Sequence, residues 1–196
     1  WVGIRITEEN SKINKDREIF FKILEVSTIW FQQNLEEHEG SKKYLKKRLI
    51  SDNTIKAFRV GYSYNAKTTL FNFLKSENFK DEDIIKSNVV KIGDNKKIKD
   101  FFYKRLIFPI ANEQNKIIGF GGRVLDNSNP KYLNSPESNF FKKRNILYNL
   151  NLAKQTIRKK NNLLLCEGYM DVISLYENNI KTAVAPLGTA LTETQL

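Results

Sequence analysis

Two acidic residues near the C-terminal end of the sequence have the spacing of a divalent-metal site. Glu167 follows the apolar run Leu163–Cys166, and Asp171 comes four residues later, with Gly168 between them. Open α/β sheets bind ligands at the carboxyl ends of their strands, and two carboxylates held there could share a hydrated Mg²⁺ ion. Alternatively, the same acids only stabilise the start of a helix through its dipole. The spacing leaves both interpretations open.

A second candidate set is cationic. Arg123, Lys131 and Lys143 could form a track for phosphate groups. Tyr132 is interleaved with them and could stack on a base. The pair Gly121–Gly122 could let the backbone approach a phosphate closely, or could serve only in turns. The glycine spacing does not match a dinucleotide-binding fingerprint, which also requires a helix directly after it.

The charge balance points to a polyanionic partner. Lys and Arg total 33 against 22 Asp and Glu, a net charge of +11, and each phosphate that a basic side chain neutralises releases counterions. The competing explanation is an AT-rich genome, which raises the lysine content of every protein. Charge therefore favours nucleic acid without identifying it.

Several classes of protein are excluded by composition. The single cysteine, Cys166, rules out a disulfide framework within the chain, and together with the single histidine, His38, it cannot build a Cys/His zinc site. A Ser-His-Asp triad would need His38, which lies in a charged, helix-like stretch. No apolar run approaches the roughly 20 residues that span a bilayer. A reducing, cytoplasmic location without membrane contact is expected.

Helices around these residues can be predicted from the periodicity of the apolar positions. Apolar residues at helical spacing predict a long amphipathic helix over Asp16–Glu37, with Trp30 and Phe31 on its buried face. Residues 1–15 are expected to be a linker. Shorter helices are predicted at Ser41–Arg48, Ser51–Phe58, Thr68–Lys75, Asp81–Ser87 and Leu150–Lys159. The lysine-rich stretch Lys91–Lys99 is expected to be a loop.

Two patterns predict sheet. Strands are expected at Phe58–Tyr62 and in a hairpin formed by Leu106–Ile110 and Ile117–Phe120. Leu163–Cys166 reads as a short buried strand, followed by a helix that ends near Asn178 and a second strand at Thr182–Ala185. Strand, helix and strand at this spacing predict a βαβ unit and a parallel sheet.

Taken together and in order, several motifs resemble the bacterial DnaG-type primases. They are Arg105–Ile110, Gly119–Arg123, Lys131–Glu137, Leu147–Tyr148, Glu167–Val172 and Leu187–Ala190. The Glu167–Asp171 motif alone would indicate only a Toprim domain, which topoisomerases and some nucleases share. One departure from the family pattern is Asn149, which stands where a glycine is usual. The resemblance is dense from about Phe58 to Leu196 and looser back to Asp16.

The resemblance implies roles for individual residues. Glu167 and Asp171 correspond to the acids of the first Toprim motif, and both are expected to act in catalysis and to hold metal. The residues expected to bind template or nucleotide are Arg105, Arg123, Lys131, Tyr132, Asn134 and Lys143. The expected fold is a basic α+β subdomain of the primase core over residues 16–158, followed over 159–196 by the beginning of an α/β Toprim domain with a parallel sheet.

The resemblance also implies a reaction and its partners. A primase joins ribonucleoside triphosphates into a short RNA primer on a single-stranded DNA template, with Mg²⁺ or Mn²⁺ as cofactor. The family's further Toprim acids would lie beyond Leu196, its zinc-binding domain would precede this chain, and a C-terminal domain would bind the replicative helicase. We therefore expect a fragment that is inactive alone. The alternatives are a fragment of another Toprim enzyme, a nuclease or topoisomerase, and a non-catalytic basic module that binds single-stranded nucleic acid.

Overall fold

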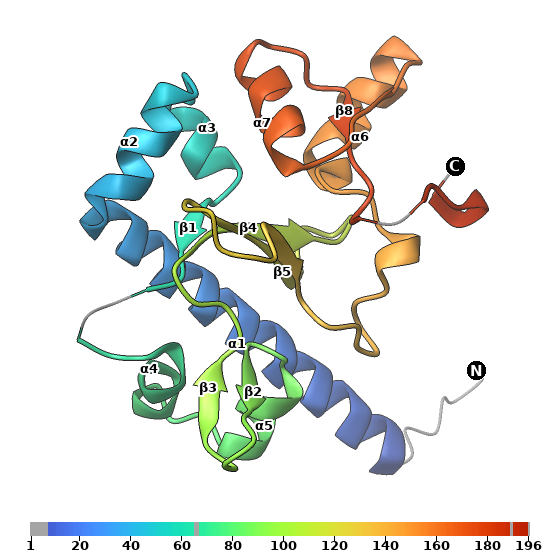
Figure 1. Cartoon of the computed structure of the whole chain (residues 1–196). Coiled ribbons are helices and arrows are strands. Elements are labelled where there is room, and N and C mark those ends of the chain that lie inside the picture. The colour runs from blue at the N-terminus through green and yellow to red at the C-terminus, as the bar shows by residue number, and fades with distance from the viewer. Residues whose placement is uncertain (1–7, 65–66, 189, 196) are drawn as a thin grey trace, which may run out of the picture.

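A four-stranded antiparallel sheet lies at the centre of the molecule (Figure 1). The computed structural model describes residues 8–64, 67–188 and 190–195. The central strands are β1 (Gly61–Tyr62), β4 (Arg105–Ala111), β5 (Ile117–Val124) and β6 (Tyr132–Asn134), in the order β1-β4-β5-β6. The β4–β5 hairpin confirms the sequence prediction. The strand expected at Phe58–Tyr62 is shorter than predicted, because Phe58 caps the preceding helix.

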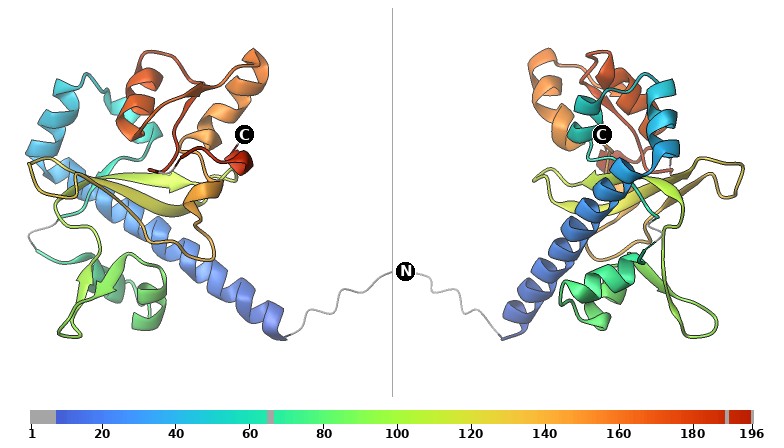
Figure 2. Two further views of the ribbon diagram at one scale, coloured as in Figure 1. Left: turned by 45° about the vertical axis from the view of Figure 1, so that its right-hand side comes forward. Right: turned by 90° about the vertical axis from the view of Figure 1, so that its left-hand side faces the viewer.

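Helix α1 (Glu8–Glu37) crosses one face of this sheet (Figure 2). Trp30 and Phe31 are buried, as their helical spacing predicts, and Phe31 packs edge-on against Phe120 of β5. The helix begins eight residues earlier than Asp16, so residues 8–15 of the expected linker are helical. Residues 1–7 lie outside the described part of the chain. The charged residues along 8–15 are compatible with an exposed helix as well as with a linker. Composition therefore could not distinguish the two there.

The shorter helices follow the predicted positions within a few residues. They are α2 (Glu39–Lys47), α3 (Asp52–Ala57), α4 (Leu70–Ser76), α5 (Asp81–Lys86) and α6 (Leu150–Lys160). Ser51 caps α3, with its hydroxyl accepting a hydrogen bond from the backbone N–H of Thr54. Asn149, in place of the usual glycine, adopts the left-handed conformation with φ of 70° just before α6. Asparagine is among the few other residues that tolerate this region.

The prediction of a loop at Lys91–Lys99 is wrong. Strands β2 (Val90–Ile92) and β3 (Ile98–Asp100) form a small antiparallel hairpin there. The Asp100 carboxylate accepts hydrogen bonds from the backbone N–H groups of Leu70 and Phe71, at 2.8 and 3.0 Å, and so ties the hairpin to the start of α4. Both strands are short and lysine-rich, so the alternation of side chains that marks a strand is masked by charge.

The C-terminal part forms the predicted βαβ unit on the other face of the central sheet. Strand β7 (Leu164–Leu165), helix α7 (Tyr169–Glu177) and strand β8 (Ala183–Val184) follow one another, and β7 pairs with β8 in parallel. The expectation that β7 is buried is wrong, since its two leucines are 42% and 44% exposed. Within the described residues β7 pairs with β8 alone. A short 3₁₀ helix, η2 (Glu193–Gln195), ends the described chain.

One apolar core joins the βαβ unit to the central sheet. Tyr169, Met170 and Ile173 of α7 are buried in the same cluster as Leu106 and Phe108 of β4. Among the described residues, no helix has both the length and the apolar character needed to cross a membrane. The α+β subdomain and the beginning of a parallel α/β sheet thus pack as neighbours around the residues singled out above.

Candidate active-site face

The two acids of the C-terminal motif share one open hollow. Glu167 follows β7 and Asp171 lies in the first turn of α7, and both side chains are exposed. The hollow has a volume of about 610 Å³ and is also lined by Leu165, Cys166, Pro186 and Leu191. Burial, together with the nearby Asp171 carboxylate, raises the pKa of the Cys166 thiol. The predicted position of Glu167 at the carboxyl end of a parallel strand is confirmed.

This acid pair suits a divalent cation only as part of a ligand set. Exposed carboxylates can hold an Mg²⁺ ion that keeps several of its waters. Within the described residues no group of three or more His, Cys, Asp or Glu side chains is placed to hold a metal. Glu167 and Asp171 therefore fit as two of the oxygen ligands, and further ligands would have to come from substrate, water or other residues.

Gly121 and Gly122 do not form a turn, so that interpretation of the sequence is wrong, while a close approach of their backbone to a phosphate stays a prediction. Both lie inside β5 and face opposite sides of the sheet. A Cβ atom added to Gly121 would lie 2.5 Å from Cζ of Tyr169, and one added to Gly122 would lie 2.6 Å from Cδ1 of Phe102. The glycines are needed because an aromatic ring packs directly on the strand from each side.

Arg123 is held between two tyrosine rings. Its guanidinium carbon lies 4.9 Å from the ring centroid of Tyr44 in α2 and 5.5 Å from that of Tyr132 in β6. Arg123 also donates a hydrogen bond to the Tyr44 hydroxyl and is only 8% exposed. Its Nε atom has no hydrogen-bond partner among the described residues. The cation is thus fixed by cation–π contacts and partly desolvated, which strengthens its attraction for an anion.

Sequence reasoning did not identify Tyr44. It lies 79 residues from Arg123 in the chain, in a helix whose basic residues look like an ordinary solvated face. Nothing local to α2 signals the contact. The predicted residue Tyr132 does lie beside Arg123, because the two are cross-strand partners in the β5–β6 ladder. Tyr132 is 41% exposed.

The remaining cations are spread more widely. Lys131 precedes β6 and is exposed. Arg105 lies on the opposite face of the sheet from Arg123, where its Cδ atom lies beside Gly122, and its Nη1 atom donates to the Pro130 carbonyl at 2.8 Å. Burial lowers the pKa of Arg105, although the Asp126 carboxylate opposes this. Arg105 therefore supports the β5–β6 connection and does not line the Arg123 face.

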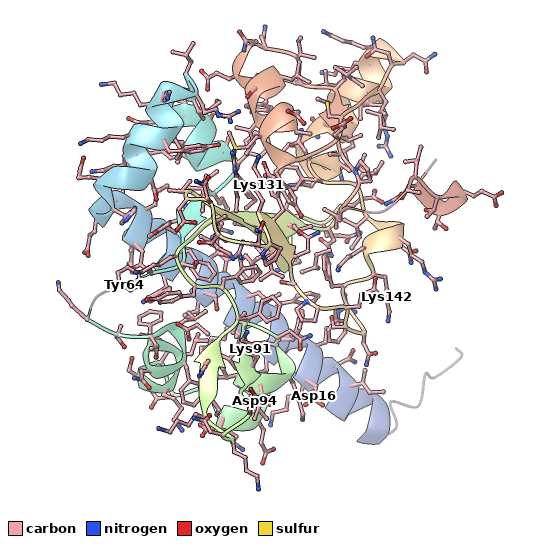
Figure 3. All side chains as sticks on the ribbon, viewed as in Figure 1. Asp16, Tyr64, Lys91, Asp94, Lys131 and Lys142 are labelled. Carbon is pink, nitrogen blue, oxygen red and sulfur yellow. The ribbon has the colours of Figure 1, made fainter. Side chains whose placement is uncertain are left out.

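Lys143 begins a separate 3₁₀ turn, η1 (Lys143–Asn145), near the described C-terminal end. Its backbone N–H donates to Oε1 of Glu137 at 3.0 Å, and its carbonyl accepts from Gln195 at 3.2 Å. Figure 3 shows Lys131 and Lys142, the neighbour of Lys143, at separate places on the molecule. The structure thus groups Arg123 with Tyr132 and next to Lys131, and a single track that includes Lys143 and faces Glu167 stays a prediction.

Asn134 and Tyr169 connect the cationic face to the acidic motif. The Tyr169 hydroxyl donates to Oδ1 of Asn134 at 2.5 Å, and Nδ2 of Asn134 donates to the Leu187 carbonyl at 2.9 Å. The Tyr169 ring stacks on Phe108 with centroids 5.2 Å apart. Burial raises the pKa of Tyr169, so its hydroxyl stays protonated and able to donate. Sequence reasoning assigned no role to Tyr169, although its place inside the acidic motif was visible.

Comparisons with known proteins agree with this arrangement. Residues 30–154 match the family described as "DNA primase catalytic core, N-terminal domain", and residues 161–196 match the Toprim domain. The chain is 40% identical to a DNA primase of Clostridium acetobutylicum over 99% of its own length and 33% of that protein. It is 35% identical to a DNA primase of Escherichia coli over 90% and 31%. The chain therefore spans about a third of the length of these relatives.

Solved structures give the same result. The Aquifex aeolicus primase, described by its zinc-binding and RNA polymerase domains, matches 92% of this chain and 44% of its own, with a TM-score of 0.86 and 31% identity. A DnaG primase catalytic domain bound to single-stranded DNA matches 93% and 59%, with a TM-score of 0.83 and 35% identity. The chain belongs to the DnaG-type DNA primase family, with the N-terminal domain of the catalytic core followed by the first part of a Toprim domain.

Proposed function

We propose that this chain is part of an enzyme that synthesises short RNA primers on single-stranded DNA by metal-dependent nucleotidyl transfer. The observation that carries the proposal is the physical link between two groups of different chemistry. Arg123 and Tyr132 provide a cation and an exposed ring, Glu167 and Asp171 provide exposed carboxylates, and Tyr169 packs between the two groups. Nucleotidyl transfer needs both, because it handles phosphates and neutralises charge at the reacting phosphoryl group.

The basic residues would bind template and incoming ribonucleoside triphosphate. Arg123 is held in one place by its two tyrosines, so it would bind a phosphate with little loss of side-chain entropy. Lys131 is exposed and would reach a phosphate with its long side chain. The ring of Tyr132 would stack on a base. Lys143 would contact the nucleic acid from the separate 3₁₀ turn η1. Support for a nucleic-acid ligand comes from the similar primase structure described as bound to single-stranded DNA, together with the net charge of +11.

Toprim domains and primases generally use divalent metal ions, and the acid pair fits such use. Glu167 and Asp171 would hold Mg²⁺ or Mn²⁺ in the hollow that they share. A bound ion of this kind stabilises the negative charge that develops on the transferring phosphoryl group. Glu167, as the exposed carboxylate at the strand end, would serve as a ligand or would accept the proton of the primer 3′-hydroxyl.

The isolated 196-residue chain is proposed to bind nucleic acid without making primers. Its described residues contain no group of three or more metal-binding side chains, so this chain alone resembles the non-catalytic binding module that is the second candidate function. In the full-length protein, the RNA primer would remain on the template, and the replicative helicase would bind elsewhere, through the C-terminal domain that the family resemblance implies.

Replacing Glu167 by glutamine in the full-length protein tests the proposal. Glu167→Gln keeps the size of the side chain and removes the charge that would hold metal or accept a proton. Primer synthesis, measured by incorporation of labelled ribonucleotides in Mg²⁺ or Mn²⁺, should fall at least about 100-fold, by analogy with the loss of one strong charge-stabilising group. Binding of single-stranded DNA should change less than about twofold, because it rests on cations. If primer synthesis stayed near the wild-type rate, Glu167 would not act in catalysis and would only stabilise the start of the helix.

A further inference from the structure

We propose that Asn134 and Tyr169 are a positioning pair, which sets where the Glu167–Asp171 motif lies relative to the β5–β6 face, and that Asn134 does not contact template or nucleotide. This inference rests on the proposed function. It replaces the expectation, drawn from the family resemblance, that Asn134 binds the substrate. Its starting point is that the Oδ1 and Nδ2 atoms of Asn134 form hydrogen bonds with two different segments of the βαβ unit.

The first contact holds the start of α7. Tyr169 is the first residue of that helix, directly after Gly168 and two positions from each of the acids. Its ring is confined by Phe108 on one side, in a parallel stack, and by Tyr148, whose ring meets it edge-on with centroids 4.7 Å apart. Only 5% of Tyr169 is exposed. A ring so enclosed has little freedom, so a bond to its hydroxyl fixes the backbone that carries both carboxylates.

The second contact holds the segment after β8. Nδ2 of Asn134 donates to the carbonyl of Leu187, the residue before Gly188. Because β7 and β8 are parallel neighbours, their carboxyl ends lie side by side. The segment after β8 also reaches the acidic hollow, through Pro186 and Leu191. Asn134 is therefore bonded to the segments that follow both parallel strands, to Tyr169 after β7 and to Leu187 after β8. These two bonds fix the position of the acidic motif.

The register of β5 and β6 explains how the Tyr169 hydroxyl comes within hydrogen-bond distance of Asn134. Gly121 is the cross-strand partner of Asn134. The missing side chain at Gly121 leaves the space that the Tyr169 ring occupies, with Cζ only 2.5 Å from where a Cβ atom would be. The ring thus lies over the glycine and its hydroxyl ends at the amide on the next strand. Asparagine suits the position because its side chain carries both an acceptor oxygen and a donor nitrogen, whereas aspartate offers acceptors alone and would face the Leu187 carbonyl with a charge.

Steady-state kinetics in the full-length protein separates positioning from substrate contact. Asn134→Asp should lower kcat for primer synthesis by about 10- to 100-fold, since a displacement of about 1 Å in an active site can cost that much. The Mg²⁺ concentration for half-maximal activity should rise severalfold. The KM for ribonucleotides, and the Kd for single-stranded DNA measured by fluorescence anisotropy, should stay within about threefold of wild type, because no substrate contact is lost. Asn139→Asp, which makes the same change at an exposed position, should leave all four values unchanged.

A second measurement does not depend on activity. The melting temperatures of Asn134→Ala, Tyr169→Phe and the double variant form a cycle. If the two residues act through one hydrogen bond, adding Tyr169→Phe to Asn134→Ala should lower the melting temperature by less than half of what it does alone. Tyr169→Phe also keeps the ring and its packing, so it can be assayed even if Asn134→Asp fails to fold.

Each other outcome overturns the pair or the proposed function. A rise in ribonucleotide KM or DNA Kd that accounts for the loss of activity would make Asn134 a substrate contact. Wild-type kcat in Asn134→Asp, or additive melting shifts, would remove the positioning role. A wild-type protein that makes no primers would refute the proposed function, while the melting cycle would still report whether the pair is coupled.

Discussion

Replacing Gly121 by alanine should destabilise the chain through a single identifiable contact. The added Cβ atom would lie 2.5 to 2.7 Å from Cζ, Cε2 and Oη of Tyr169, far inside van der Waals contact. The ring cannot swing away, because Phe108 and Tyr148 enclose it. Forcing extra atoms into a packed core costs about 1–3 kcal/mol.

The same substitution has two further effects on stability. If the ring shifts, the hydrogen bond from Tyr169 to Asn134 is lost, and an unsatisfied buried hydroxyl costs about 1–3 kcal/mol. Against this, alanine in a strand restores about 0.5–1 kcal/mol of the backbone entropy that glycine loses. The net loss in free energy of unfolding should be about 1–5.5 kcal/mol. For a chain of this length that corresponds to a fall in melting temperature of roughly 2–22 °C.

Thermal unfolding followed by far-ultraviolet circular dichroism measures this loss, and Gly122→Ala is the matched control. Its Cβ atom would lie 2.6 Å from Cδ1 of Phe102 on the opposite face, so it should also destabilise the chain while leaving Tyr169 in place. In the full-length protein, Gly121→Ala should therefore reduce primer synthesis more than Gly122→Ala at a temperature where both are folded. A melting temperature for Gly121→Ala within a degree of wild type would refute the idea that this glycine exists to admit the Tyr169 ring.

Two other predictions concern binding and acid stability. Arg123→Ala should weaken single-stranded DNA binding by roughly 1–3 kcal/mol, as expected for a charge-assisted phosphate contact in a partly dry site, and wild-type affinity should fall steeply as salt rises; a flat salt response in an anisotropy titration would contradict both. The pKa of Glu177 is lowered by hydrogen bonds from Thr54 and from the backbone and side chain of Ser51, so the stability it contributes is present above its unfolded pKa and is lost as pH falls through the lower folded pKa. Urea unfolding between pH 6 and pH 3 should thus show a smaller acid-induced loss of stability in Glu177→Gln than in wild type, and equal losses would show that this contact does not stabilise the fold.

Most helices, the β4–β5 hairpin and the βαβ unit could be predicted from the sequence because their signals are local. Apolar residues at helical or alternating spacing, with Ser51 as a cap, report on neighbours a few residues away. The same holds for Glu167, whose place at a strand end follows from the apolar run before it. Prediction failed at the β2–β3 hairpin and at residues 8–15, where charged side chains hide the periodicity that local reasoning uses.

The hydrogen bonds and ring contacts that the candidate residues make could be found only in the folded structure. The Arg123–Tyr44 contact joins residues 79 apart in sequence, Asn134 reaches Leu187 across 53, and Tyr169 reaches Asn134 across 35. These pairs form only when separate elements pack together, and the sequence of one element carries no signal of its contact with the other. For this reason the residue types at the site, cations, acids and an amide, were visible in the sequence, while their division into substrate-facing and positioning roles depends on which side chains the folded sheet brings within hydrogen-bond distance.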